Sequence, residues 1–408
     1  MAGLMARWTS YQRRLIWFLS VATFFEGYDM FALSQLLPEL RREFALSPSA
    51  AGWMIAAINL GTVIAFALVG LADRLGRRRV LAITITGYTV ASLASAFAPG
   101  AVLFTLAQLL ARIFLIGEWA VASVVAAEEY PAEDRGTVLG VVSACGSLGS
   151  IVCAGVVPLL LKTPPGWRAV YMVGAAPLLL VAVARRGLRE TQRFEREAAA
   201  APKPLISGAI LRGPSRARVL RLGLIWALTY VCTQNAITFW KEFAVSERGM
   251  SSATVGKMIT LAALASMLPI FASGRLLDRF GRRAGAAVIY GALAVGVGLA
   301  YTLRGGAALN LALVFAVFGV SAVLSVLNAY TTELFATRDR AEAFAWSNNL
   351  LGRITYVLSP IAVGYAAEVF GWGPSVGVTA LSALAALGLI LLWLPETRGR
   401  ELEETAKV

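Results

Sequence analysis

Histidine is absent from the 408-residue chain, and charged residues make up only 15% of it. The first absence removes the side chain best suited to carry a proton near neutral pH, which leaves carboxylates for any such role. The three cysteines, Cys145, Cys153 and Cys232, all lie within apolar runs, so no disulfide or cysteine–metal framework is implied. The chain also lacks a glycine-rich cofactor loop and a nucleophile–base pair. We therefore predict no metal, no cofactor and no enzymatic activity.

Apolar residues make up 58% of the chain, and its mean hydropathy is +0.69. This composition excludes a soluble domain of this size. Apolar runs of about 20 residues recur along the chain, long enough to cross a bilayer as helices, and they do not alternate in polarity as membrane β-strands do. We predict an all-α membrane protein with twelve transmembrane helices, at 15–37, 50–71, 80–98, 101–126, 137–161, 168–184, 219–240, 253–276, 284–303, 308–332, 341–367 and 373–394.

A charged segment that contains proline and glycine separates the sixth and seventh predicted helices. Its composition is typical of a linker. We predict an N-terminal six-helix bundle at 1–184, a cytoplasmic linker at 185–218, and a C-terminal six-helix bundle with a cytoplasmic tail at 219–408. Lysine and arginine gather in the termini and the even-numbered connections, which by the positive-inside rule places both termini in the cytoplasm.

The net charge of +13 follows this distribution. A basic cytoplasmic face beside anionic membrane lipid accounts for it without nucleic-acid binding. The use of arginine over lysine indicates a GC-rich bacterial source, and hence an inner-membrane location. We expect a monomer.

The two halves repeat sequence landmarks at one spacing. Asp73 in "GLADRLGRR" and Asp278 in "RLLDRFGRR" lie 205 residues apart, and Glu128 and Glu333 have the same separation. Two parallel six-helix repeats with a binding site between them are typical of secondary transporters.

At these residues the chain resembles the major facilitator superfamily over essentially its whole length. "GLADRLGRRR" is similar to the loop motif of that superfamily, and "PETRGRELEE" (395–404) to the segment after the last helix of its sugar-porter branch. "EGYD" (26–29), "RIFLIGEWA" (112–120) and "GRITYVLSP" (352–360) together resemble the aromatic acid:proton symporters and related organic-anion carriers. The resemblance implies two pseudo-repeats that transport by alternating access.

The loop motif and its repeat supply candidate gating residues. The resemblance implies that their acidic and basic side chains form a network that latches the halves in the outward-open state. The alternative is that the arginines only follow the positive-inside rule. The candidates are Asp73, Gly76, Arg77, Glu128, Arg135 and Asp278.

Charged residues within the first and fourth predicted helices are the candidates for proton coupling. Glu26 and Asp29, three residues apart, share one helical face, and Arg112 lies at similar depth with Gln108 one turn away. An ionised group in the bilayer normally has a partner or faces a cavity. Arg112 can neutralise one acid and leave the other to titrate, and the resemblance favours Asp29; a salt bridge that only fixes packing is the alternative. Glu118 is either a second relay acid or an interhelical packing partner.

Arg353 lies in the middle of the eleventh predicted helix, and the second half offers no mid-helix acid to pair with it. A buried guanidinium without a carboxylate favours an anionic ligand. We therefore predict that Arg353 binds a substrate carboxylate; contact with backbone carbonyls or snorkelling is the alternative.

Further aromatic and amide residues at similar depth are candidates for the walls of a binding site. Few polar groups within apolar walls suit a small organic ligand, and the aromatic content favours an aromatic or amphipathic substrate over a sugar. With Arg353 and Arg112, the predicted substrate-binding residues are Tyr28, Gln108, Gln234, Asn235, Phe239, Asn328, Asn349 and Tyr356.

The sequence thus predicts a proton-coupled symporter of a small organic anion that works by alternating access. A sugar or polyol porter is an alternative, suggested by the "PETRGR" tail, and a cation or drug:proton antiporter that uses Glu26 and Asp29 as counter-ions is another. A receptor or scaffold needs neither repeated gates nor mid-helix acids.

Overall fold

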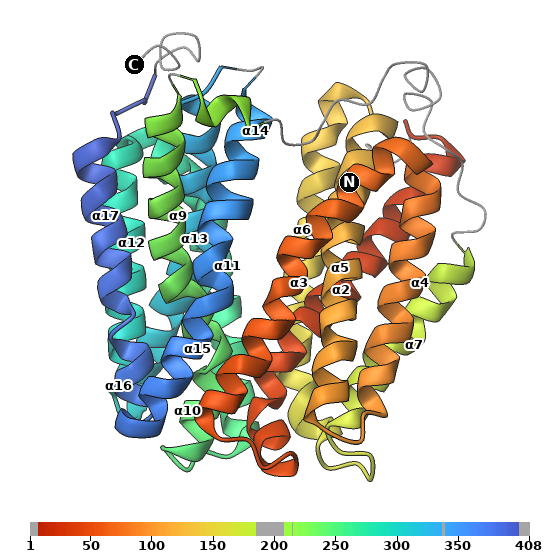
Figure 1. Cartoon of the computed structure of the whole chain (residues 1–408), viewed down its shortest axis with the longest axis vertical. Helices are drawn as coiled ribbons and strands as arrows, with labels where there is room; N and C mark the ends of the chain where they lie inside the picture. Colours follow the sequence, from red (N-terminus) through yellow and green to blue (C-terminus); the bar gives the residue numbers. More distant parts are fainter. Residues whose placement is uncertain (1–6, 185–207, 214, 337–338, 400–408) are drawn as a thin grey trace. The chain divides into compact units, whose positions relative to one another are not determined.

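The computed structural model describes residues 7–184, 208–213, 215–336 and 339–399, without the side chains of 67–74, 132, 180, 182–184 and 209. All regular structure in these ranges is helical (Figure 1). The contacts divide the chain into two compact units. Unit 1 comprises Met1–Leu40 and Ala57–Lys203, and unit 2 comprises Arg41–Ala56 and Pro204–Val408.

The described residues of unit 1 form a bundle of six helices whose backbones approach closely at small residues. A Cβ atom on Gly27 or Gly149 would overlap the backbone of the facing helix, and the Ser150 hydroxyl donates to the carbonyl of Gly27 at 2.9 Å. Small residues allow such contact between membrane helices. The helices are α2 (Ser10–Glu43), α3 (Pro48–Leu75), α4 (Arg77–Ala96), α5 (Ala101–Glu129), α6 (Ala132–Leu160) and α7 (Arg168–Ala184); the end of α2 and the start of α3 cluster with unit 2.

Unit 2 contains helices that are interrupted where the sequence predicts single spans. A bend of 44° separates α9 from α10, and a π-helix, η3, joins α14 to α15. The elements are η2 (Ala209–Leu211), α9 (Arg216–Thr238), α10 (Trp240–Ser246), α11 (Ser252–Phe280), α12 (Arg282–Ala300), α13 (Gly306–Glu333), α14 (Arg340–Phe344), η3 (Ala345–Gly352), α15 (Arg353–Phe370), α16 (Trp372–Gly377) and α17 (Ala380–Trp393).

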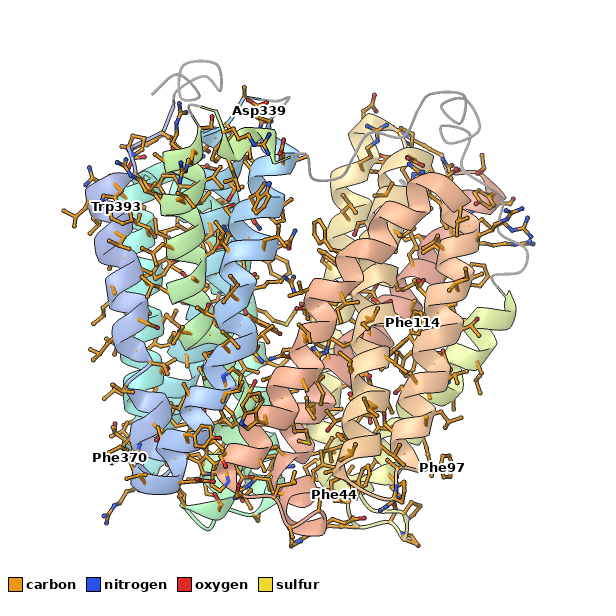
Figure 2. All side chains as sticks on the ribbon, in the orientation of Figure 1. Phe44, Phe97, Phe114, Asp339, Phe370 and Trp393 are labelled. Atoms are coloured by element: carbon orange, nitrogen blue, oxygen red, sulfur yellow. The ribbon has the colours of Figure 1, made fainter. Side chains whose placement is uncertain are left out.

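Each of the twelve predicted transmembrane helices coincides with a helix or a group of consecutive helices. Ten are long and apolar enough to cross a membrane, and the bent pair of α9 and α10 is an eleventh. Arg168–Leu179 of α7 is a shorter apolar helix. Large apolar side chains point outward from the helices, as Figure 2 shows for Phe97 and Phe370. These two side chains are 67% and 69% exposed. Such a surface suits lipid and confirms the all-α membrane fold.

Candidate substrate and proton sites

The two acids of α2 are buried inside unit 1. Glu26 and Asp29 are each 3% exposed, and the Ser92 hydroxyl of α4 donates to Asp29 Oδ1 at 3.0 Å. Both carboxylates act electrostatically on Tyr88 of α4. Arg112 of α5 is 6% exposed and lies within electrostatic reach of Asp29. The structure therefore brings the predicted acids and their predicted cation together, around α4.

Two further residues predicted near these charges are also buried in unit 1. The Gln108 amide donates to Ser95 Oγ at 2.9 Å and is 2% exposed. Tyr28 is also buried, and its hydroxyl has no hydrogen-bond partner among the described residues. Its ring faces Gly174 of α7, where an added Cβ atom would come within 3.2 Å.

Glu118 is fully buried in unit 1 and accepts a hydrogen bond from Thr84 Oγ1 at 2.6 Å. This bond joins α4 to α5, as an interhelical packing partner would. A proton relay at this position stays a prediction.

In unit 2, Arg353 is the first residue of α15, directly after η3. Its Nε atom is buried and has no hydrogen-bond partner among the described residues, and its Cζ atom lies 5.8 Å from the centre of the Tyr356 ring. Within the described ranges, no ion pair joins Arg353 to a carboxylate. A buried guanidinium nitrogen without an acceptor favours an anionic ligand.

Two aromatic rings of α9 extend the aromatic cluster from Tyr356. The ring of Tyr230 lies 5.3 Å from that of Tyr356 and 5.4 Å from that of Trp226, and its hydroxyl donates to Asn348 Oδ1 at 2.7 Å. Sequence reasoning missed Trp226, Tyr230 and Asn348. The available signal was the spacing of the two aromatics, four residues apart and hence on one face of a helix.

Glycine allows α9 to approach η3 at this cluster. An added Cβ atom on Gly352 would lie 2.8 Å from the Cβ of Trp226, and one on Gly223 would lie 2.9 Å from the Cβ of Leu351. A larger residue at either position would push the aromatic face of α9 away from Arg353.

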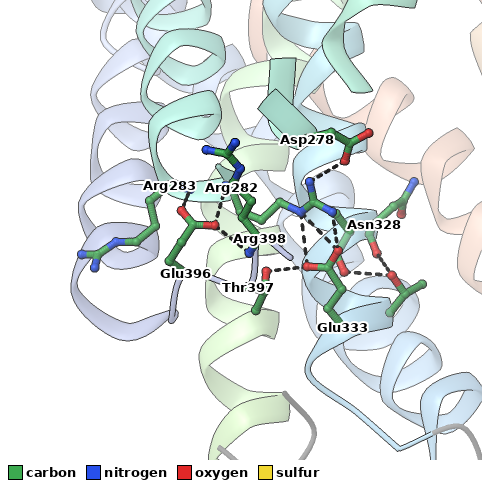
Figure 3. A network of polar contacts seen from close by, with 10 residues as sticks. Asp278, Arg282, Arg283, Asn328, Glu333, Glu396, Thr397 and Arg398 are labelled. Atoms are coloured by element: carbon green, nitrogen blue, oxygen red, sulfur yellow. Dashed lines mark hydrogen bonds and ion pairs between the residues drawn. The ribbon is translucent and has the colours of Figure 1, made fainter. Parts of the chain in front are cut away.

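The remaining predicted binding residues are dispersed through unit 2. Asn235 is fully buried and donates to Ser359 Oγ at 2.8 Å, and Gln234 donates to Thr238 at 3.1 Å within α9. Phe239 stacks on Trp372 with ring centres 4.5 Å apart. Asn349 is half-buried in η3. Asn328 is exposed and lies in the group of polar residues that Figure 3 draws near the end of α13.

The predicted gating turns have the same backbone form in both units. Gly76 and Gly281 precede α4 and α12 with φ angles of 93° and 95°, a region that favours glycine. Arg77 pairs with Glu128 at 3.4 Å, and Arg282 pairs with Glu333 at 2.7 Å. These pairs occupy equivalent positions of the predicted repeat.

Figure 3 shows the network around the turn in unit 2. Arg282 also binds Asp278 at 2.7 Å, and Glu396 accepts hydrogen bonds from the backbone N–H groups of Arg282 and Arg283 at 2.8 and 3.0 Å. Burial opposes ionisation of Glu396, but the backbone donors of Arg283 and Arg282 outweigh it and lower the pKa of its carboxyl. In unit 1, the side chain of Asp73 lies outside the described residues, and Arg135 donates to the carbonyl of Tyr130 at 3.0 Å.

A partly buried ion pair in unit 2 was not predicted from the sequence. Arg41, at the end of α2, pairs with Glu242 of α10, and its Cζ atom lies 5.4 Å from the Trp372 ring. Glu242 and its neighbour Lys241 are 2% and 1% exposed. The pair joins residues 41–56 to the rest of unit 2.

The described residues have the features of a membrane transporter. They combine membrane-spanning helices with buried acids, ion-paired turns in both units, and a guanidinium that no described carboxylate pairs with. The sequence model of the Major Facilitator Superfamily matches residues 19–353 and 222–407. The chain belongs to this superfamily. It is therefore a multi-pass membrane transporter and not an enzyme.

Individual relatives agree with this membership. The chain is 27% identical to the probable 4-methylmuconolactone transporter of Cupriavidus pinatubonensis, over 96% of this chain and 92% of that one. It is 25% identical to the niacin transporter NiaP of Acinetobacter baylyi, over 95% of each chain. Its fold is similar to that of a bacterial homolog of the human lysosomal transporter Spinster, with a TM-score of 0.78, 16% identity, and coverage of 94% of this chain and 97% of that one.

Proposed function

We propose that the protein is a proton-coupled symporter of a small organic anion, with an aromatic carboxylate as the favoured substrate. It works as a monomer in the bacterial inner membrane, surrounded by lipid, with both termini in the cytoplasm. The named relatives support the substrate class, because niacin is an aromatic carboxylic acid and 4-methylmuconolactone is a ring-containing one.

The observation that carries the proposal is the environment of Arg353. No described residue accepts a hydrogen bond from its buried Nε atom, and the Tyr356 ring lies beside its guanidinium, next to the Tyr230 ring. A carboxylate would accept two parallel hydrogen bonds from the guanidinium, which satisfies the orphaned nitrogen. The adjacent Tyr356 ring offers an apolar face to the rest of the ligand. Gln234, Asn235, Phe239, Asn328 and Asn349 remain weaker candidates for ligand contact.

Proton coupling is assigned to the acids of α2. Asp29 takes up and releases the proton because it lies near Arg112 and Ser92, whose contacts stabilise the charged form, while burial stabilises the neutral form. Small changes around such a group shift its protonation. Binding of substrate and proton then changes the relative populations of the inward-open and outward-open states.

The paired turns are assigned to gating. Ion pairs fix the N-terminal ends of α4 and α12: Arg77 with Glu128 at α4, and Arg282 with Asp278 at α12. Asp73, Gly76 and Arg135 complete this proposed network.

The test is uptake by the purified full-length protein in proteoliposomes, with and without an inward proton gradient. The panel contains aromatic and aliphatic carboxylates, sugars and organic cations. We expect uptake of an aromatic carboxylate that increases with the gradient and is unchanged when sodium is replaced by potassium. Sugar uptake with indifference to substrate charge would identify a sugar porter instead, and cation efflux that does not depend on Arg353 would identify an antiporter.

A further inference from the structure

Asn348 lies one π-helical turn before Arg353. The backbone N–H of Arg353 donates to the carbonyl of Asn348, five residues earlier. Residues five apart are separated by about 140° around an α-helix. In a π-helix, the hydrogen bond between residues five apart closes one turn. The wide turn therefore brings Asn348 and Arg353 to nearly the same side of the helix.

The side-chain oxygen of Asn348 is bound by a neighbouring residue, whereas its amide nitrogen is not. The Tyr230 hydroxyl donates to its Oδ1 atom at 2.7 Å, and the residue is 6% exposed. Nowhere in the described ranges does an acceptor bind its Nδ2 group. Since Tyr230 fixes the oxygen, the amide nitrogen is an oriented donor that a ligand can use.

Aromatic rings border both polar groups. Tyr356 lies beside the Arg353 guanidinium, with 5.8 Å between Cζ and the ring centre, and Tyr230 connects Tyr356 to Trp226. Arg353 also acts electrostatically on Tyr230, so the cation and the Tyr230–Asn348 pair share one neighbourhood. Flat apolar faces next to two oriented polar groups suit a planar ring that carries polar atoms at separate positions.

We propose that Asn348 determines substrate specificity by donating a hydrogen bond to an acceptor on the substrate ring, while Arg353 binds the carboxylate. The substrate class is then a planar ring monocarboxylate with a second acceptor, such as a ring nitrogen or a ring carbonyl, away from the carboxylate. This inference rests on the proposed function, because it requires that Arg353 binds a carboxylate.

The test compares nicotinate with benzoate, which differ by a ring nitrogen in place of one C–H group. Uptake is measured with the full-length protein in proteoliposomes. The wild type is expected to prefer nicotinate about tenfold in half-saturation concentration, because a buried donor left without an acceptor is unfavourable. Picolinate, whose nitrogen adjoins the carboxylate, is expected to behave like benzoate. Asn348→Leu is expected to remove the preference for nicotinate and to retain benzoate uptake.

Two variants serve as the second measurement and the control. Tyr230→Phe keeps the ring but frees the Asn348 amide, and is expected to reduce the preference to about threefold. Ser347→Ala alters a buried neighbour whose hydroxyl donates to the Ala343 carbonyl at 2.7 Å, and is expected to keep the full preference. Equal use of both acids by the wild type, or a preference that survives both Asn348→Leu and Tyr230→Phe, would overturn this inference and leave the proposed function standing. If the wild type takes up no carboxylate at all, the proposed function itself fails.

Discussion

The two units share the turns at the ends of their helices and differ in the charges at the middle. Gly76 and Gly281 have φ angles within two degrees of each other, 93° and 95°, and the arginine after each pairs with a glutamate 51 residues further on. Unit 1 buries Glu26, Asp29 and Arg112, with Glu118 also buried in α5, whereas in unit 2 Arg353 lies beside an aromatic cluster. The two units have the same residues at these helix ends but different charged residues within the bundles. We interpret this difference as a separation of roles, in which unit 1 binds the proton and unit 2 binds the anion.

The largest effect is expected when the charge of Arg353, the proposed anion-binding residue of unit 2, is removed. Arg353→Gln is expected to lower carboxylate uptake at least about 100-fold, because two charge-assisted hydrogen bonds to the substrate are lost. Uptake and ligand binding are measured on protein that elutes as a single species. Arg304→Gln, at an exposed position, is the matched control. Carboxylate uptake that survives in Arg353→Gln contradicts the assignment of the anion to unit 2.

The next test removes the proton carrier of unit 1. Asp29→Asn is expected to abolish accumulation driven by a pH gradient, while exchange of external for internal substrate continues, because the neutral amide mimics the protonated acid. Accumulation and counterflow are measured in the same proteoliposome preparation. Accumulation by Asp29→Asn at the wild-type level would show that the proton travels elsewhere.

A comparison within unit 1 sharpens the assignment further. Glu26→Gln is expected to reduce gradient-driven accumulation by a few-fold only, less than Asp29→Asn, because Asp29 accepts the Ser92 hydrogen bond and interacts electrostatically with Arg112. The ratio of accumulation at inward and zero gradients ranks the two variants. The opposite ranking would make Glu26 the proton site.

The smallest effect concerns the shared turns. Arg282→Ala is expected to destabilise the protein by about 1.5–3 kcal/mol, because Arg282 makes charge-assisted hydrogen bonds to both Glu333 and Asp278. Arg77→Ala is expected to cost less, about 0.5–1 kcal/mol, because its contact with Glu128 is longer, at 3.4 Å. Thermal unfolding midpoints in detergent compare the two. Equal shifts would mean that the two ion pairs stabilise the protein equally despite their different lengths.

Composition and periodicity were sufficient to predict the helical spans, because each apolar run must satisfy its backbone hydrogen bonds internally in a bilayer. They also identified Glu26, Asp29, Arg112 and Arg353, since a charged residue within an apolar run can be recognised from the sequence alone. They did not reveal η3 or the bend between α9 and α10, because an apolar run has the same pattern whether its turns are α or π.

The aromatic cluster was missed for a related reason. Trp226 and Tyr230 are apolar or amphipathic residues in an apolar helix, and nothing in their types distinguishes a ligand-facing ring from a lipid-facing one. Their proximity to Arg353 depends on how closely α9 packs on η3, which the glycines at 223 and 352 permit. Such packing is a property of two helices and not of one segment.

The wide turn of η3 has a consequence in genetic terms. A π-helical segment corresponds to one residue more than the α-helix that it replaces. Deletion of a single codon within 345–347 would therefore let the segment relax to an α-helix, in which Asn348 and Arg353 remain five residues apart and lie about 140° apart around the helix axis. Every site residue would still be encoded, yet the arginine and the amide would no longer face the same ligand.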